Sequence, residues 1–406
     1  MEANSTMDNN NYVIADRTKK IVYALIAIGV VGLIWGMFIH PAGSQRIWAN
    51  VLVNSFFFLG IGAAALFFLT LQYATESHYA VPVKRVVEAL TGYLPVGALF
   101  LVIVLAAGAL HLHHLYHWME PGIAVKGSEN YDKVIAAKSP YLNQTFFWIR
   151  TLAYLGIWIA YQRLFRKRSL AEDMEGGLNI HNSNIKSAAI FLILYGVSSS
   201  ASAWDWLMSI DAHWFSTMFG WYVFSGTWVS AMIMLILFVL YLKRKGYLHQ
   251  VNENHIHDIG KWMFAVSVLW TYLWFCQFML IWYADIPEEV TYFKARFEDY
   301  KPVMWTMFFV NFALPTIFLI ARDAKRNYGY LTFVGCVIFF FHWVDVYQIV
   351  MPGTVGANWK FFSPLELGMF CGFLGVFLLV VHTQLAKAPL MVKSHPYLEE
   401  GLHHEF

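Results

Sequence analysis

Ten apolar runs of about 20 residues divide this chain, and each could carry a helix across roughly 30 Å of hydrocarbon. Every backbone polar group in lipid must be satisfied within its segment, so runs of this length favour helices. With 58% apolar and only 13% charged residues among 406, the composition is unlike that of a soluble domain. We expect an all-α polytopic membrane protein with about ten spans: 21–38, 48–71, 91–116, 145–165, 187–208, 215–242, 260–283, 303–321, 330–350 and 365–385.

The distribution of lysine and arginine predicts the orientation of these spans. About 19 of the 28 basic residues fall in the N-terminal leader, in alternate loops and in the C-terminal tail. Short loops rich in basic residues stay in the cytoplasm. Both termini are therefore expected in the cytoplasm, with the loops 116–143 and 284–302 outside.

The order of the spans predicts an internal repeat. Residues 48–208 and 209–350 each hold four spans that start at the outer face, so we expect two parallel four-helix bundles related by an axis along the membrane normal. Residues 1–47 form a leader and the first span, and 351–406 form the tenth span and a tail. These two outer spans flank the bundles.

Charged residues in lipid are costly and usually functional. Asp205 lies about 27 Å from the inner end of its predicted helix, at a rise of 1.5 Å per residue. Arg150 is expected about one turn into the neighbouring helix, counted from the outer face, and is the natural partner of Asp205. His111 is expected high in the third helix, with His114 at the outer mouth. Together they predict a polar pocket that opens outward.

A quinol fits such a pocket, because its two hydroxyls lose protons as electrons leave, and a histidine and a carboxylate can accept them. Trp148, Trp204 and Trp206 could wall the ring. Against this interpretation, a single histidine on an apolar helix is more often a packing residue, and aromatic residues near bilayer edges usually form the interfacial belt.

Further polar side chains suggest a route for protons. Small hydroxyl residues commonly serve close helix packing, so the serines among them have a structural explanation as well as a functional one, and the acids at helix ends could simply mark those ends. The candidates are Asp345, His342, Glu366, Asp285, Ser199 and Ser202.

Several classes of function find no support. The three cysteines lie singly, without a CxxC pair or a CxxCH haem-attachment sequence, and no Walker sequence is present. We expect no metal site and no covalently bound cofactor. Only His342 lies near mid-depth, so paired haem ligands of a b-type cytochrome are not expected. A net charge of +2 gives no reason to expect a nucleic-acid partner.

Three motifs carry a resemblance to a known family. They are YLNQTFFWIRTLAY at 141–154, WDWLMSIDAHWFSTMFGWYVFSG at 204–226 and IWYADIPEEVTYF at 281–293. The chain resembles, over nearly its whole length, the NrfD/PsrC-like membrane subunits of bacterial alternative complex III, a quinol:cytochrome c oxidoreductase.

This resemblance implies a subunit of the bacterial inner membrane whose partners include a multihaem cytochrome, an iron–sulfur subunit, a paralogous NrfD-like subunit, membrane lipids and a terminal oxidase. Haems and iron–sulfur clusters then belong to the partners, and quinol is the one small molecule expected here. The paralogue binds quinol with a histidine of the third helix and neighbouring acids, so His111 or His114 and Asp205 are the matching candidates. Two alternatives remain: a scaffold without quinol, and an independent proton-coupled transporter.

Overall fold

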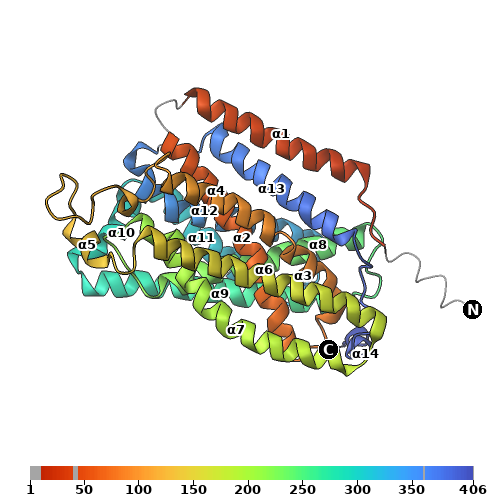
Figure 1. Ribbon diagram of the computed structural model, residues 1–406. Helices are drawn as coiled ribbons and strands as arrows, with labels where there is room; N and C mark the ends of the chain where they lie inside the picture. The colour runs from red at the N-terminus through yellow and green to blue at the C-terminus, as the bar shows by residue number, and fades with distance from the viewer. Residues whose placement is uncertain (1–10, 40–43, 360–361, 406) are drawn as a thin grey trace, which may run out of the picture.

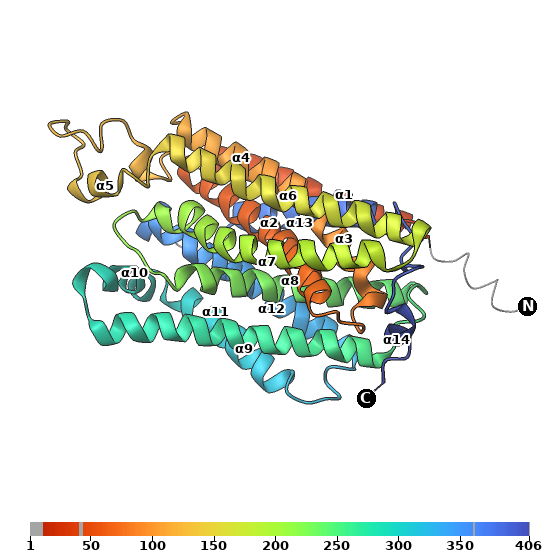
Figure 2. The ribbon, with the colours of Figure 1, turned by 60° about the horizontal axis from the view of Figure 1, so that its bottom comes forward.

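The computed structural model describes residues 11–39, 44–359 and 362–405 and is all helical there, without a strand among those residues. Its long helices run side by side (Figures 1 and 2). The α-helices are α1 Asp16–Ile39, α2 Ser44–Ala74, α3 Lys84–Thr91, α4 Leu94–Ala109, α5 Lys133–Lys138, α6 Gln144–Glu175, α7 Leu178–Trp206, α8 Phe219–Arg244, α9 Glu253–Ala284, α10 Pro287–Glu298, α11 Lys301–Phe318, α12 Tyr328–Thr354, α13 Pro364–Leu385 and α14 Leu398–Leu402. Short 3₁₀ turns are η2 Val81–Val83, η3 His117–Met119, η4 Met208–Ile210 and η5 Gly356–Asn358.

The predicted class, an all-helical multi-pass membrane protein, is confirmed. Eight helices of the described part are long and apolar enough to cross a membrane, which is fewer than the ten predicted. The other two predicted spans, 145–165 and 303–321, are helical as α6 and α11. They are less apolar because α6 carries Arg150 among several Trp and Tyr residues, and α11 carries Lys301 and Asn311.

Two sets of four long helices can be followed in the packing of the bundle. In the first, α2 packs against α4 and α7, and α6 packs against α7; in the second, α8, α9, α11 and α12 pack in a ring. The groups share one core, because α2 also packs against α8 and α12, and α7 against α8. Accordingly, α2 and α8 are the most deeply buried of the spanning helices.

A glycine seam joins the flanking helices α1 and α13, which lie side by side in Figure 1. A Cβ built on Gly29 would lie 2.4 Å from Cα of Gly372, and one on Gly32 would lie 2.8 Å from Cα of Gly368. Small residues allow such close backbone approach, which gives helix pairs in lipid their van der Waals contact. The pair presents its remaining apolar surface outward, as expected for lipid contact.

Buried ion pairs mark one end of the bundle, the end where α3, α14 and the start of α1 lie (Figures 1 and 2). Lys84 of α3 pairs with Glu172 of α6 at 2.9 Å, and Arg166 of α6 pairs with Glu88 of α3 at 2.5 Å. These contacts fasten α3 to the last turns of α6. The elements α5 and α10 lie at the opposite end.

The third predicted span, 91–116, is wrong at its outer end, because α4 stops at Ala109. His111 adopts a left-handed backbone conformation with φ of 57°. Its N–H donates to Gly108 O at 3.0 Å, and the N–H of Leu112 donates to Ala107 O at 2.9 Å, which is the hydrogen-bond pattern of a Schellman helix end. Glycine usually occupies the left-handed position, so the sequence offered no warning of this stop.

The glycine seam leads to a stability prediction. Gly29→Leu should separate α1 from α13 and lower the free energy of unfolding by about 1–3 kcal/mol, the usual cost of overpacking. Gly156→Leu in α6 is the matched control, since a Cβ there meets nothing within 4 Å. Unfolding of the detergent-solubilised protein measures both, and equal stability of the two variants would contradict the importance of the seam.

Candidate functional site

Asp205 and Arg150 form a bidentate ion pair near the end of the bundle that carries α5 and α10. Arg150, two turns into α6, donates from Nε to Oδ2 and from Nη2 to Oδ1 of Asp205, each at 2.8 Å. Tyr154 adds a third donor at 3.2 Å from Oδ2. The carboxylate, in the last turn of α7, is fully buried. Both carboxylate oxygens of Asp205 accept hydrogen bonds. The pair therefore fixes α6 against α7.

A cavity of about 250 Å³ lies beside this pair, lined mostly by aromatic and aliphatic side chains that include Tyr141, Trp204, Met208 and Phe215. Ser209 also lines it and donates to the backbone oxygen of Asp205 at 2.5 Å. Among the described residues, the buried indole N–H of Trp204 has no acceptor. An apolar cleft with a few polar groups is the usual form of a small-molecule site.

The structure does not bring His111 and His114 to Asp205. Both are exposed, and Nδ1 of His114 lies 3.6 Å from Glu120. The buried member of this run is His113, which contacts Val104 O through Nε2 at 2.9 Å. Burial lowers the pKa of His113, so the ring is neutral and fits a role in closing the end of α4. The early stop of α4 accounts for this rearrangement.

A second buried carboxyl, Asp345 in α12, has a different environment. Tyr222 of α8 donates to its Oδ1, and the indole of Trp270 in α9 donates to its Oδ2 at 3.0 Å. Both donors are neutral, and Asp345 makes no ion pair within the described part of the chain. A carboxylate buried without a cation is costly, and such groups tend to take up a proton instead. Asp345 is therefore the acid best suited to gain and lose one.

His342 lies one turn before Asp345 and is buried as well. Its ring meets the Trp270 ring edge to face, with centroids 5.2 Å apart. Neither of its nitrogens has a hydrogen-bond partner among the residues described. The sequence singled out His342 and Asp345 but missed Tyr222 and Trp270, because neutral donors carry no signal of depth or charge.

Arg296 of α10 is another buried residue that the sequence did not single out. Its Nε and Nη2 donate to the carbonyl oxygens of Gln348 and Ile349 in α12, each at 3.1 Å. Pro352 explains why the first of these is free, since it lacks the N–H that would bond the carbonyl four residues earlier. A proline near the end of a predicted span was the one available clue.

Two small cavities lie beside this arginine, and one of them also borders Tyr222 of the Asp345 cluster. One of about 50 Å³ is lined by Asp211 and Arg296, and one of about 10 Å³ is lined by Arg296, Tyr222 and Gln348. The side-chain amide of Gln348 has no partner in the described part of the chain. Each space is close to or above the size that one water needs, so the lining can order water between the surface near Asp211 and Tyr222.

The remaining candidates occupy structural positions. Glu366 starts α13 in a capping box with Ser363 and pairs with Arg46 at 2.8 Å. Asp285 is exposed as the left-handed C-cap of α9. Ser199 and Ser202 line a cavity of about 20 Å³ between α2, α7 and α8, and Ser202 donates back to Ser199 O at 2.9 Å. That back-bonding is typical of hydroxyl residues in packed helices.

The class of protein is thus a multi-pass, all-helical membrane protein with polar clusters in its interior. No protein-family model matches the chain, and no curated protein matches it either. The resemblance to NrfD/PsrC-like subunits therefore stays a prediction that rests on the three motifs.

The ion pair at Asp205 predicts strong coupling between its partners. Asp205→Asn and Arg150→Gln should each lower the free energy of unfolding by about 3–5 kcal/mol, since each leaves a buried charge without its partner. The double variant should lose clearly less than the sum. As a control, Lys294→Gln removes an exposed pair with Glu298 and should change little. Additive single losses in unfolding experiments would refute the coupling.

Proposed function

We propose that the chain is the ActF-type membrane subunit of a bacterial respiratory quinol:cytochrome c oxidoreductase of the alternative complex III kind, and that its own task is to carry protons. The observation that supports proton transfer is the Asp345 cluster, a buried carboxyl held by two neutral donors. A group that exchanges protons inside a membrane is expected to be an acid of this kind, close to sites for water. The three sequence motifs support the assignment to the complex.

In this proposal the end with Lys84, Arg166 and α14 faces the cytoplasm, because basic residues concentrate there. The end with α5 and α10 then faces outward and is the docking surface for partner subunits. Haems and iron–sulfur clusters belong to those partners. Protons would pass between the outer surface near Asp211 and Asp345 through the water sites beside Arg296.

The reaction that this arrangement would serve is the oxidation of a quinol to a quinone. A quinol loses two electrons and two protons and becomes a quinone; the electrons pass to the cofactors of the partner subunits, and the protons pass to acceptors in the protein and then to water. This chain contributes only proton acceptors and donors. Asp345 takes up a proton from one side of the cluster and releases it to the other, with the Tyr222 hydroxyl bridging it to the nearest water site.

The proton-carrying role predicts a specific loss of coupling. Asp345→Asn keeps the shape of the side chain but cannot exchange a proton, so proton translocation per electron should fall at least about tenfold, while the complex still assembles. Tyr222→Phe should weaken coupling in the same direction. The measurement is acidification driven by quinol oxidation in liposomes that contain the intact complex.

Asp299→Asn is the matched control for that experiment, because Asp299 is exposed at the end of α10. It should leave the ratio of protons to electrons unchanged. An unchanged ratio and turnover in Asp345→Asn would remove proton transfer through this residue from the mechanism.

A second candidate function, quinol binding, is favoured by the 250 Å³ cavity beside Asp205. Its aromatic lining suits a quinol ring, and the indole N–H of Trp204 is a donor that a quinone oxygen could accept from. Asp205 itself would act here by holding Arg150 and α6 in place, because both of its oxygens already accept hydrogen bonds. The cavity also lies close to Tyr141, which could supply a hydroxyl.

Quinol binding in this cavity predicts a change in KM. Trp204→Phe keeps an aromatic ring but removes the N–H, so the KM for quinol should rise about fivefold, the equivalent of one hydrogen bond of about 1 kcal/mol. Trp221→Phe alters an exposed indole of α8 and serves as the control. Steady-state kinetics of the intact complex distinguish the two. A KM that is equal in both variants argues against quinol in this cavity.

The scaffold alternative predicts the opposite pattern. If Asp345→Asn and Trp204→Phe both leave turnover and proton coupling unchanged, the chain's contribution is docking through its outer elements. Replacement of the exposed loop 124–130 should then release a partner subunit during purification. An independent transporter would instead move a solute or protons in liposomes that contain this chain alone.

A further inference from the structure

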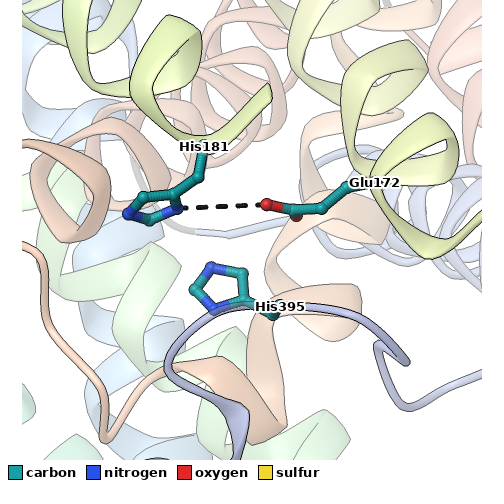
Figure 3. A group of neighbouring side chains, drawn as sticks. All are labelled: Glu172, His181 and His395. Carbon is teal, nitrogen blue, oxygen red and sulfur yellow. Dashed lines mark ion pairs between the residues drawn. The ribbon is translucent and has the colours of Figure 1, made fainter. Parts of the chain in front are cut away.

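Three side chains from distant parts of the sequence meet at the end of the bundle that carries α3 and α14. Glu172 lies near the end of α6, His181 near the start of α7, and His395 in the tail that follows α13, and Figure 3 shows them turned toward one another. Their potential ligand atoms all lie within 4.8 Å of one another. Nδ1 of His181 is 3.9 Å from Oε1 of Glu172.

The donor atoms of this cluster are buried and largely uncommitted. All three residues are more than nine-tenths buried. Across the described part of the chain, neither nitrogen of His181 nor Oε1 of Glu172 has a hydrogen-bond partner. Buried polar atoms normally have partners, so each such atom calls for an explanation. A bound ion would satisfy Oε1 of Glu172 and one ring nitrogen of His181, and the other nitrogen of that ring would carry the proton.

The neighbours orient the cluster for this purpose. Lys84 donates to Oε2 of Glu172 at 2.9 Å, which leaves Oε1 facing the histidines. The backbone N–H of Tyr397 donates to Nδ1 of His395 at 3.2 Å, and the other ring nitrogen faces the cluster (Figure 3). A cavity of about 20 Å³ borders both histidines, which is enough for one water.

We propose that Glu172, His181 and His395 bind one divalent transition-metal ion of the zinc type, with water as the fourth ligand. Two imidazoles and one carboxylate form a recognised zinc ligand set that leaves a position open, and imidazole ligands suit this class of metal. The ion clamps the C-terminal tail onto the turn between α6 and α7.

The geometry requires only small movements. Zinc bonds of about 2.0–2.2 Å place tetrahedral ligand atoms about 3.4 Å apart, so side-chain shifts of about 1 Å bring the cluster together. Both imidazoles are buried, and an imidazole coordinates a metal ion in its neutral form. Binding of His395 through the nitrogen that faces the cluster moves the ring proton to Nδ1, at the loss of the weak contact with Tyr397.

The tail is already docked where the clamp would hold it. The N–H of Lys393 donates to Oδ1 of Asp173 at 2.9 Å. Asp173 directly follows Glu172 in the sequence. An ion would thus add to an existing contact, and its removal should loosen the tail while the membrane-spanning helices stay folded. The competing explanation is a polar cluster that holds only water and the Lys84 ammonium group.

The test is the zinc content of the full-length protein, purified without a histidine tag, exposed to Zn²⁺ and then freed of loosely bound metal. We expect close to one zinc per chain, and a drop of at least about tenfold in zinc affinity for His395→Ala and for His181→Ala. His117→Ala and His403→Ala are matched controls, since both remove exposed histidines that could bind metal adventitiously. Zinc that stays in His395→Ala but leaves with the controls would overturn the proposal, as would wild-type protein without zinc.

Two measurements on the unaltered chain keep the proposal testable if a variant fails to fold. X-ray absorption at the zinc edge should show two imidazoles and oxygen ligands at about 2.0–2.2 Å; a shell of three or more imidazoles would contradict this ligand set. Removal of the metal with a chelator should speed proteolysis within residues 386–397, and added Zn²⁺ should reverse it. Cleavage at equal rates with and without zinc would refute the clamp.

Discussion

The fold depends on the rule that a polar group inside a bilayer must find its partner within the protein. Asp205 meets that demand with a guanidinium group that bonds both of its oxygens. Glu366 meets it with Arg46 and the start of α13. Asp345 meets it only with neutral donors. The same rule thus yields two carboxylates paired with guanidinium groups and one buried acid held by neutral donors.

The backbone obeys the rule as well, and α12 shows how. Pro352 has no N–H to donate to Gln348 O. Arg296 from α10 donates to that oxygen instead, and it also donates to Ile349 O. An interruption in one helix therefore fixes the position of another. That arginine also lines both small cavities. The side chain that compensates for the missing hydrogen bond of α12 therefore also supplies a polar surface that can lead water toward Tyr222.

The sequence predicts the features that hydropathy and charge determine, which are the helices and the pairing of buried charges. Apolar runs indicated the helices. The expected depth of Arg150 and Asp205 in neighbouring helices predicted that they pair. His111 does not lie beside Asp205, because it takes a left-handed position, although it is not a glycine, and α4 ends early. Tyr222 and Trp270 were missed because aromatic residues occur throughout such chains. Partnerships between neutral groups depend on how helices rotate against one another, and a single sequence does not record that rotation.

The clustering of Glu172, His181 and His395 was equally invisible, because no short spacing links the tail to the turn between α6 and α7. That turn and the Asp205 pair sit at opposite ends of α7, about 36 Å apart at 1.5 Å per residue from 181 to 205. Effects at sites so far apart are usually additive. Loss of an ion from the tail should therefore leave the Arg150 pair intact, and loss of that pair should leave metal binding intact. A variant that altered both would indicate general unfolding of the bundle, which separates damage to the fold from damage to either site.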